Sequence, residues 1–384
     1  MIRIGFGVTQ FARGSAGSGI DGLGHYTHEL GNALSVIPEI DIFPFSFGYE
    51  MKILFCSKYV AKFARFDFEL LKGILIPGLC IKGIPGEKVD LMHATDHLIP
   101  FVKSVPLVAT LMDAIPLSNP ECVGGRHYWL NKVKLILWKM SARRADHIIT
   151  ISEYSKTEIS RWFDIPLNRI SVIPLGVDSR FFEVISTKDR RDVLKRHNVP
   201  ENYFLSVGTL QPRKNLSRVL AAMRMLPDAI KKETPLVIVG RVGWDVDDLL
   251  LEIEQAELEG WCIKLDRISD LDLRALLQSA KALVFPSLAE GFGLPVLEAF
   301  ASRTLVITSN TTSLPEVSNG AAILIDPLNV AELSKALIRV LNEKDSMQDL
   351  IERGYKNATS MTWVRCAEKT VEVYRKLALG ASFD

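Results

Sequence analysis

The sequence predicts an α/β fold in two domains, each built on a parallel β-sheet. The chain has 384 residues, which is too long for one ordinary α/β domain and suits two. Short apolar runs typical of strands alternate with helical patterns, as they do in parallel sheets. This alternation restarts at Phe204–Val207 after a charged interval. We therefore expect two Rossmann-like domains that face each other across a cleft.

Apolar runs and their spacing place the individual elements. The first half is expected to hold a helix over Tyr26–Leu34 and strands at Ile2–Val8, Leu91–Ala94, Leu107–Leu111 and His147–Ile151. The second half is expected to hold strands at Phe204–Val207, Leu236–Val239, Cys262–Leu265, Leu283–Phe285, Leu305–Ile307 and Ala322–Ile325. Its helices are expected at Leu216–Met225, Leu271–Ser279, Leu294–Ala301 and Ala331–Leu341.

The boundary between the domains is expected within Ser179–Asn202. This interval contains the charged run Lys188–Asp192 and ends near Pro200. An exposed helix in the interval would move the boundary by a few residues. We place the two domains at 1–185 and 186–384.

Composition and charge exclude several classes of protein. The net charge is +1, so no overall attraction to nucleic acid is expected. The five cysteines are scattered without CxxC spacing, which favours a reducing compartment over a disulfide framework or a zinc site. The N-terminus has no apolar segment of signal-peptide type, and the sequence has no run of about 18 apolar residues. We expect a cytoplasmic protein, in solution or on the inner face of the membrane.

Two segments of the first half, Met51–Val89 and Arg126–Arg144, are unusually basic. The second carries six basic residues and no acid, together with Trp129 and Trp138. A basic helix that bears aromatic residues is typical of binding to an anionic membrane surface. The alternative is a partly buried helix with a solvated basic face.

A glycine-rich stretch, Gly14–Tyr26, follows the first predicted strand and includes Gly22 and Gly24. Glycines let the backbone approach an anion, and a helix N-terminus adds free N–H groups, so phosphate is the expected ligand. A flexible loop without a ligand is the alternative. A nicotinamide dinucleotide site is disfavoured, because the GxGxxG spacing is not matched cleanly and Asp41, where a ribose-binding acid is sought, lies in no clear predicted strand.

A second motif, Val207–Asn215, follows the first strand of the second half. Ligands of open α/β sheets bind beyond the carboxyl ends of the strands, so this turn is well placed. Arg213 and Lys214 bring two cations to a helix start, where a diphosphate would be held and its developing charge stabilised. A solvated basic pair is the alternative.

The third motif, Phe285–Ala299, is the most informative. A strand ends, a glycine-rich loop turns, and a helix begins near Leu294. Glu290 lies in the loop and Glu298 about one turn into the helix, so both carboxylates can line one pocket. Carboxylates accept several hydrogen bonds from sugar and ribose hydroxyls, and the adjacent helix N-terminus suits phosphate. The combination predicts a ligand that is both sugar and phosphate. Alternatively, one glutamate caps the helix and the other lies on the surface.

At these residues the sequence resembles the retaining glycosyltransferases of family 4, which have the GT-B fold. The resemblance covers most of the chain and includes the phrases Ala145–Lys156, Val172–Asp178 and Ser309–Val317. The sequences of Gly208–Asn215 and Asp113–Ser118 are most similar to those of mannosyltransferases that build bacterial O-antigen and related surface polysaccharides. In that fold residues 1–185 would bind the acceptor and 186–384 the donor, with the last helix, about 363–377, crossing back onto the first domain.

The resemblance implies a role for each candidate residue. Lys214 would hold the donor diphosphate, Glu298 the ribose and Glu290 the hydroxyls of the transferred sugar. The loop Gly22–Gly24 would close over the diphosphate from the other domain. The backbone amides of Phe292, Gly293 and Leu294 would meet phosphate, and Gly291 would belong to the same donor-binding loop.

The sequence departs from the family pattern at two positions. Many relatives have Arg where this chain has Thr209, so Arg213 would supply the second cation. Many also have His where this chain has Met112, so the contact to the donor sugar would be missing or would come from Asp113 or His93. We take Asp113 as a candidate catalytic residue beside Glu290, Lys214 and Arg213.

The implied activity is retaining α-mannosyl transfer from GDP-mannose in the biosynthesis of O-antigen, lipopolysaccharide or a related surface polysaccharide. The acceptor would be a glycan or a lipid-linked oligosaccharide, and nucleic acid is not an expected partner. A UDP-sugar donor carrying a hexosyl or N-acetylhexosaminyl group is an alternative, as is a non-catalytic GT-B scaffold. We expect no cofactor and no metal, because the acids of Asp245–Asp248 fit a helix start, where they favour the dipole.

Overall fold

The computed structural model describes residues 1–51, 53–55, 58–66, 84, 88–102, 104–119 and 128–379. For Ser18, Ile53, 128–134 and 344–346 it describes the backbone alone. The chain divides into two compact units. Unit 1 holds the described residues within 1–118, 125–176 and 363–384, and unit 2 holds those within 177–362 together with Asn119.

Unit 1 is built on a seven-stranded parallel sheet in the order β5-β2-β1-β6-β7-β8-β9. Its strands are β1 (Ile2–Gly7), β2 (Ile40–Phe47), β5 (Ala61–Phe63), β6 (Leu91–Ala94), β7 (Leu107–Thr110), β8 (His147–Thr150) and β9 (Ile170–Val172). A two-stranded antiparallel hairpin is formed by β3 (Ile53–Leu54) and β4 (Lys58–Tyr59). Strands β6, β7 and β8 are buried along their whole length, which explains their unbroken apolar character.

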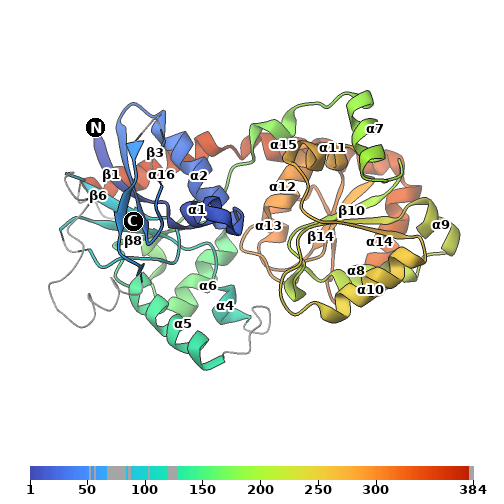
Figure 1. Cartoon of the computed structure of the whole chain (residues 1–384), viewed down its shortest axis with the longest axis horizontal. Coiled ribbons are helices and arrows are strands. Elements are labelled where there is room, and N and C mark those ends of the chain that lie inside the picture. Colours follow the sequence, from blue (N-terminus) through green and yellow to red (C-terminus); the bar gives the residue numbers. More distant parts are fainter. Residues whose placement is uncertain are drawn as a thin grey trace. The chain divides into compact units, whose positions relative to one another are not determined.

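The helices of unit 1 come from both ends of the chain (Figure 1). They are α1 (Thr9–Arg13), α2 (Gly22–Ser35), α4 (Ile115–Ser118), α5 (Tyr128–Ala142), α6 (Glu153–Phe163) and α16 (Trp363–Ala378), with a π-helical turn at Gly14–Ser18 and a 3-10 turn at Leu167–Arg169. The C-terminal helix α16 packs against α2, β1 and β6. Arg375 pairs with Glu39, and the Tyr374 hydroxyl lies 2.6 Å from His93 Nδ1. The last described helix is therefore part of the core of unit 1.

Unit 2 is built on a six-stranded parallel sheet in the order β12-β11-β10-β13-β14-β15. Its strands are β10 (Phe204–Val207), β11 (Leu236–Val239), β12 (Cys262–Leu265), β13 (Ala282–Phe285), β14 (Val306–Ser309) and β15 (Ile323–Ile325). Its α-helices are α7 (Thr187–Arg196), α8 (Leu216–Arg224), α9 (Asp228–Glu233), α10 (Asp247–Leu258), α11 (Asp270–Ser279), α12 (Leu294–Ala301), α13 (Leu314–Ser318), α14 (Val330–Asn342) and α15 (Lys344–Ser360). Short 3-10 turns lie at Ser179–Phe182 and Pro212–Lys214.

The two parallel-sheet α/β units confirm the predicted fold class. Two local expectations were wrong. Asp41 lies inside strand β2, near its start, and its carboxylate pairs with Lys58 Nζ at 2.8 Å. The helix expected from Tyr26 begins at Gly22, because the Asp21 side chain accepts a hydrogen bond from the Gly24 amide at 2.9 Å and caps it. Gly22 and Gly24 therefore form the first turn of a helix rather than a loop.

The units divide between Gly176 and Val177, nine residues before the boundary placed at 185/186. The intervening residues are held by helix α11 of unit 2. The Ile185 amide donates to the Gln278 side chain at 3.0 Å, and Arg274 pairs with Glu183 at 2.9 Å. These contacts explain why the charged interval lies inside unit 2 and not at its edge.

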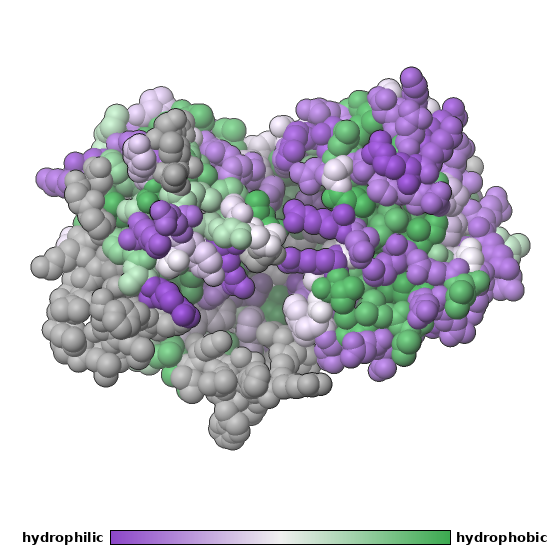
Figure 2. Space-filling model, viewed as in Figure 1, coloured by the Kyte–Doolittle hydropathy of each residue, from purple (hydrophilic) through white to green (hydrophobic). Residues whose placement is uncertain are grey.

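The described surface is mainly hydrophilic on the face shown in Figure 2, where hydrophobic residues show in separate patches. Single exposed apolar side chains such as Leu251 and Leu258 are normal for a globular surface. Among the described helices, none combines the length and the apolarity that crossing a membrane requires.

Candidate functional site

The candidate site in unit 2 is built at the carboxyl ends of β10 and β13. After β10 the chain turns through Gly208 and a 3-10 turn that carries Arg213 and Lys214 into helix α8. After β13 it runs through the loop that holds Glu290 and enters helix α12. The two strands are neighbours in the sheet, so both loops lie at the edge where ligands of open α/β sheets bind.

Glu290 joins the two loops through both of its carboxylate oxygens. Lys214 Nζ lies 2.6 Å from Oε1, and Arg213 NH1 lies 2.5 Å from Oε2. The same guanidinium donates to the Ala289 carbonyl at 2.6 Å, and Lys214 Nζ lies 4.4 Å from the centre of the Phe285 ring. The structure therefore brings together three residues that the sequence analysis singled out from two separate motifs.

The charges in this cluster are strongly coupled. Burial opposes ionisation of Glu290, but the neighbouring Lys214 and Arg213 outweigh it and lower its pKa to about 2. Burial also lowers the pKa of Lys214, and Glu290 partly offsets that effect. One carboxylate balances one of two cations, so the cluster keeps an excess of positive charge that suits a diphosphate.

The Glu290 loop is held by the segment that follows β14, which the sequence analysis gave no role. The Ser313 hydroxyl lies 2.9 Å from the Glu290 carbonyl and 3.1 Å from the Phe292 carbonyl. Thr312 Oγ1 accepts a hydrogen bond from the Glu290 amide at 3.2 Å. The run of small polar residues at Ser309–Ser313 was the available signal, because buried hydroxyls bond to nearby backbone.

A second brace comes from Asn215, at the start of helix α8. Its side-chain amide donates to the carbonyls of Pro286 at 3.0 Å and Pro327 at 2.7 Å. The residue is buried and ties the loop after β10 to the loop after β13. Asn215 also has a positive φ of 61°, a conformation that asparagine tolerates better than most residues.

Helix α12 begins at Leu294, directly beyond the Glu290 loop, with Pro295 in its first turn. Its N-cap, Gly293, has a φ of 109°, and a side chain there would meet Leu314 Cδ2 at 2.8 Å. Gly293 makes no side-chain cap, so the predicted phosphate contacts at Phe292, Gly293 and Leu294 are not pre-empted by a capping side chain. Gly291 lies in the same buried turn.

Glu298 lies one turn into α12, partly buried, and the structure does not join it to the Glu290 cluster. Burial, together with the nearby carboxylates Asp270 and Asp178, raises its pKa to about 7. Within the described residues its carboxylate makes no hydrogen bond or ion pair. A group in this state can both donate and accept hydrogen bonds near neutral pH, as contact with ribose hydroxyls requires.

Thr209, the other departure from the family pattern, lies in the turn between β10 and the 3-10 segment. A Cβ atom added at Gly243 would lie 3.0 Å from the methyl carbon of Thr209, so the two residues are close neighbours. Arg213, which was expected to supply the second cation, binds Glu290 directly. That Arg213 takes the place of a cation at position 209 stays a prediction.

In unit 1 the structure changes the expectations for the first glycine stretch. Gly22 and Gly24 lie in helix α2, and the Gly24 amide is already bonded to the Asp21 carboxylate. A phosphate would have to compete with this cap, so the N–H group is not free as expected. His25, favoured as an ordinary polar residue at the helix start, stacks edge-on against Trp363 with ring centres 6.0 Å apart.

Asp113 and Met112 follow strand β7, and both are partly buried. Asp113 Oδ1 accepts a hydrogen bond from the Ile115 amide at 2.9 Å, which closes the turn into helix α4. This bond gives Asp113 a structural role, and its candidate catalytic role stays a prediction.

His93, the other candidate to replace the missing histidine, is fully buried in the core of unit 1. Its Nδ1 lies 2.6 Å from the Tyr374 hydroxyl and its Nε2 lies 2.8 Å from Thr110 Oγ1. Thr110 Oγ1 is in turn 2.9 Å from the Tyr26 hydroxyl. Burial lowers the pKa of His93 to about 3, so the ring is neutral and both nitrogens are occupied. These contacts give His93 a structural role in the core of unit 1, and its candidate contact to the donor sugar stays a prediction.

The basic segments are only partly described. Most of Met51–Val89, Arg126 and the side chains of 128–134, including Trp129, lie outside the described residues. Trp138 is partly buried and packs edge-on against Phe163, with ring centres 4.7 Å apart, as the alternative of a partly buried helix implies. Membrane binding by this segment stays a prediction. Arg144 stacks over the Phe101 ring at 3.8 Å.

No cluster of potential metal ligands occurs in the parts of the chain that the structure describes. Asp247 and Asp248 lie in the first turn of α10, where acids favour the helix dipole. The requirement for a metal or cofactor stays a matter for experiment.

Comparison with known proteins defines the class first. Sucrose-phosphate synthase from Thermosynechococcus elongatus superposes with a TM-score of 0.76 at 18% identity, covering 99% of this chain and 100% of that chain. The fold is therefore the GT-B fold. Two family models match: "Glycosyltransferase Family 4" over residues 20–181 and "Glycosyl transferases group 1" over 188–357. The chain belongs to the family 4 glycosyltransferases.

Two curated relatives are mannosyltransferases from Escherichia coli. O-antigen chain mannosyltransferase B is 35% identical over 231 residues, which are 60% of this chain and 60% of the relative. Serotype-specific mannosyltransferase WbdA is 28% identical over 277 residues, 70% of this chain and 33% of the relative. The chain thus spans less than two thirds of the length of either relative.

Proposed function

We propose that the protein is a retaining, GDP-mannose-dependent α-mannosyltransferase that acts in the biosynthesis of O-antigen, lipopolysaccharide or a related surface polysaccharide. The cluster of Lys214, Arg213 and Glu290 carries the proposal, because it sets a net positive charge beside sugar-binding carboxylate oxygens. The names of the relatives support mannose as the transferred sugar.

The chemistry follows from what departs in the reaction. The anomeric carbon–oxygen bond to the diphosphate breaks, and the nucleoside diphosphate leaves with the electron pair. A bond to the acceptor hydroxyl oxygen forms on the same face, and the proton of that hydroxyl passes to an oxygen of the departing diphosphate. Lys214 and Arg213 neutralise the leaving group as its charge develops. Glu290 orients the sugar by accepting hydrogen bonds from its hydroxyls and keeps the two cations in place. We expect the reaction to need no metal.

The carboxylate of Glu290 and the donor diphosphate are both anions that seek the same cations. A pKa of about 2 keeps Glu290 ionised throughout the physiological pH range. Its ion pairs with Lys214 and Arg213 are therefore not released by protonation of the carboxylate. Donor binding therefore has to share Lys214 and Arg213 between the two anions. Each cation carries several N–H donors, which permits this sharing.

A thermal-shift screen of the purified protein against GDP, UDP, ADP, NAD and NADP tests the donor. A ligand that binds only the folded state stabilises it and so raises the melting temperature. At a ligand concentration of a hundred times Kd the stabilisation is about 2.7 kcal/mol. A selective shift with GDP is expected. A selective shift with UDP would support a glycosyltransferase whose donor is a UDP-sugar instead of GDP-mannose. A shift with NAD or NADP alone would overturn the proposal. No shift with any of the five ligands would favour the non-catalytic scaffold.

A lipid-linked acceptor and peripheral contact with an anionic membrane are part of the proposal. Their support is helix α5, where Ile136 and Met140 are exposed one turn apart on the face beside Lys139. Co-sedimentation with phosphatidylglycerol vesicles at low and high salt tests the contact. Binding at low salt that weakens with salt is expected, and failure to bind at low salt would remove the membrane from the proposal.

A further inference from the structure

Unit 1 contains a pocket of about 360 Å³ that the donor chemistry does not use. Its residues lie at the ends of four parallel strands. Thr9, Gln10 and Arg13 come after β1, and Phe47 ends β2 and is followed by Gly48 and Tyr49. Arg65 and Phe66 come after β5, and His97 and Leu98 come after β6. This volume lies at the lower end of the range for ligand pockets, about 300–1,000 Å³, and suits a ligand of one or two rings.

The topology of the sheet places this pocket where α/β sheets bind ligands. The strand order β5-β2-β1-β6-β7 shows that the chain leaves β1 toward β2 and later returns to β6 on the other side of β1. The carboxyl ends of β1 and β6 thus flank a topological switch point, where loops diverge and leave a crevice. The pocket lies at that edge, because its residues directly follow these strands.

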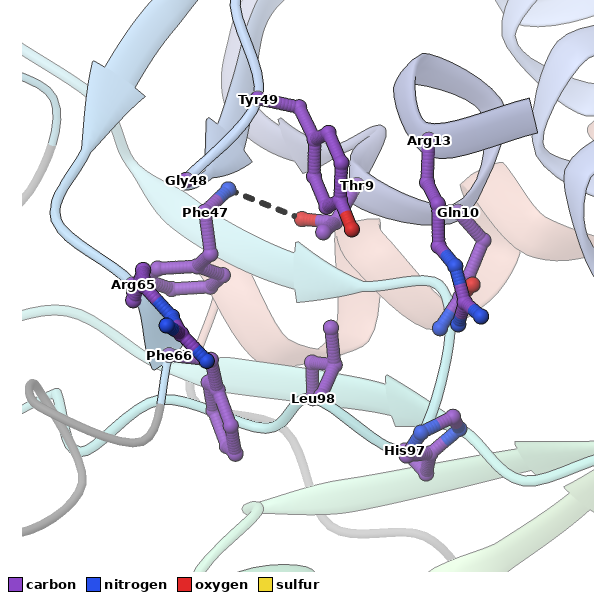
Figure 3. A pocket seen from close by; sticks show the side chains of 10 residues that line it. All are labelled: Thr9, Gln10, Arg13, Phe47, Gly48, Tyr49, Arg65, Phe66, His97 and Leu98. Carbon is purple, nitrogen blue, oxygen red and sulfur yellow. Dashed lines mark hydrogen bonds between the residues drawn. The ribbon is translucent and has the colours of Figure 1, made fainter. Parts of the chain in front are cut away.

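The described lining of the pocket is positively charged. Arg13 and Arg65 belong to its lining, and none of the described residues that line it is acidic. Figure 3 shows Arg65 and Phe66 on one side and Arg13, Gln10 and His97 on the other, with Leu98 between them. Guanidinium groups bind phosphate and carboxylate oxygens through paired N–H donors, so this arrangement suits an oxyanion.

A buried polar side chain indicates that the ligand also has hydroxyl or similar polar groups. Gln10 is 5% exposed, and its side-chain amide makes no hydrogen bond to the described residues. The amide atoms are not among the fully buried atoms that lack a partner, so they are open to the pocket, where the amide lies beside the Arg13 guanidinium in Figure 3. A ligand that bonds to both ends of the amide offers both a donor and an acceptor, as a sugar hydroxyl does.

Aromatic rings complete the lining. Tyr49 and Phe66 present flat apolar surface. The backbone amide of Phe47 donates a hydrogen bond to Thr9 Oγ1 at 3.1 Å, which fixes the position of Phe47. Flat aromatic surface, a buried amide and two guanidinium groups together match an acidic sugar: a ring with C–H faces, hydroxyls and an oxyanion. A free inorganic anion would leave the amide and the aromatic surface unused.

From these observations we infer that the pocket of unit 1 binds a sugar residue that carries an oxyanion, either a carboxylate or a phosphate. This inference rests on the proposed function in one respect, since it makes that residue the recognition element of the acceptor. The pocket residues all belong to unit 1, whereas Lys214, Arg213 and Glu290 belong to unit 2. Binding of the acidic sugar and binding of the nucleotide can therefore be measured separately.

The test titrates the full-length protein, without donor, with glucuronate, glucose 6-phosphate, glucose 1-phosphate, glucose and inorganic phosphate by calorimetry. At least one sugar that carries an oxyanion should bind about tenfold or more tightly than both glucose and phosphate. Preference for glucuronate would identify a carboxylate, and preference for a hexose phosphate would identify a phosphate. Equal binding of glucose and the acidic sugars, or of phosphate alone and the sugar phosphates, would overturn the inference.

Two variants and a matched control locate the binding. Arg65→Gln and Arg13→Gln are each expected to weaken the acidic sugar about tenfold or more, while glucose is unaffected. Both side chains are exposed, so the variants should keep the melting temperature of the wild type. Arg161→Gln removes an exposed guanidinium of unit 1 on α6 and should leave binding unchanged. Acidic-sugar binding that survives both pocket variants would place the site elsewhere and sink the inference.

GDP binding separates this inference from the proposed function. If the acidic sugar binds as predicted and GDP does not, the pocket stands and the donor proposal falls. If GDP binds selectively and none of the acidic sugars does, the donor proposal stands and the pocket inference falls.

Discussion

The two units place their candidate ligand-binding side chains at the carboxyl edge of a parallel sheet, but the charged groups of the two sites differ in exposure and pairing. In unit 2, Lys214 and Arg213 are 14% and 19% exposed and already bound to Glu290. In unit 1, Arg13 and Arg65 are exposed in an open pocket whose walls come from four strand ends. The cations of the candidate site in unit 2 are largely buried and held by an ion pair, whereas those of the pocket in unit 1 are exposed to solvent.

The difference has a physical consequence for what each site can do. The desolvation cost of the cations in unit 2 is met within the folded protein, so their positive charge acts at close range and at low dielectric. Such a site suits stabilisation of a charge that develops during a reaction. The exposed cations of unit 1 are screened by water and salt, and suit recognition of a ligand that must enter and leave.

Loss of one cation from the buried cluster is the largest expected effect. Lys214→Met keeps the volume and removes the charge, so transfer should fall roughly 100-fold or more and GDP affinity about tenfold. Product formation and calorimetry with GDP measure the two effects. Lys281→Met, at an exposed position before β13, is the control and should match the wild type. Full activity of Lys214→Met would refute the assignment of the donor site.

The comparison also predicts where each unit loses stability. Tyr374→Phe leaves His93 Nδ1 without its partner in unit 1 and should cost about 1–3 kcal/mol. Tyr203→Phe is the matched change in unit 2, where the hydroxyl donates to the Leu276 carbonyl at 2.6 Å. Hydrogen exchange followed by mass spectrometry should show faster exchange in unit 1 for the first variant and in unit 2 for the second. Equal acceleration across the whole chain in both variants would show that the units unfold together.

Glu298 provides a pH test confined to unit 2. Its folded-state pKa of about 7 lies above the ordinary value of 4.5, so the folded protein holds a proton that the unfolded chain releases. Its contribution to stability is fully present below about pH 4.5 and is lost as the pH rises through about 7. Glu298→Gln should remove this dependence and stabilise the protein by roughly 1 kcal/mol at pH 8.5 relative to pH 5, allowing for partial solvent exposure.

Urea unfolding at the two pH values measures the effect of Glu298→Gln. Glu254→Gln, at an exposed position on α10, is the control and should follow the wild type at both. A Glu298→Gln variant that keeps the wild-type difference between pH 5 and pH 8.5 would show that Glu298 is ionised in the folded state.

The smallest effect is expected from the brace behind Glu290. Ser313→Ala removes the hydroxyl that bonds the Glu290 and Phe292 carbonyls, so the loop loses about 1 kcal/mol of support and transfer should fall severalfold. The variant Ser318→Ala removes a buried hydroxyl that bonds within helix α13 and should leave transfer unchanged. Steady-state rates separate the two, and equal rates would mean that the loop needs no brace.

Much of unit 2 could be predicted from the sequence, because its strands are short, apolar and regularly spaced. Strands β10, β11 and β12 have the predicted ends, and helix α12 begins and ends where Leu294–Ala301 was expected. Lys214, Arg213 and Glu290 could be chosen as candidates from the sequence, because ligands of open α/β sheets bind beyond the strand ends, but their pairing with one another was not predicted. The brace from Ser313 was missed, since nothing in the sequence indicates which carbonyl a buried hydroxyl will reach.

Unit 1 was harder to predict for specific reasons. Strand β2 contains Pro44 and mixes polar with apolar residues, so its run did not stand out. The start of α2 at Gly22 depends on a single cap by Asp21, because glycine itself disfavours a helix. The role of His93 depends on Tyr374, 281 positions away, and the pocket depends on four separate strand ends. Long-range contacts of this kind are invisible to local patterns.

The most direct test of the central claim is a transfer assay with GDP-α-mannose and octyl glycosides as acceptors, in which NMR reads the anomeric configuration of the product. The account predicts an α-mannoside formed by the wild type, lost in Lys214→Met and unaffected in Lys281→Met. A β-linked product would contradict retention. Transfer from UDP-sugars alone would contradict the donor, and mannosyl transfer undiminished in Lys214→Met would contradict the site itself.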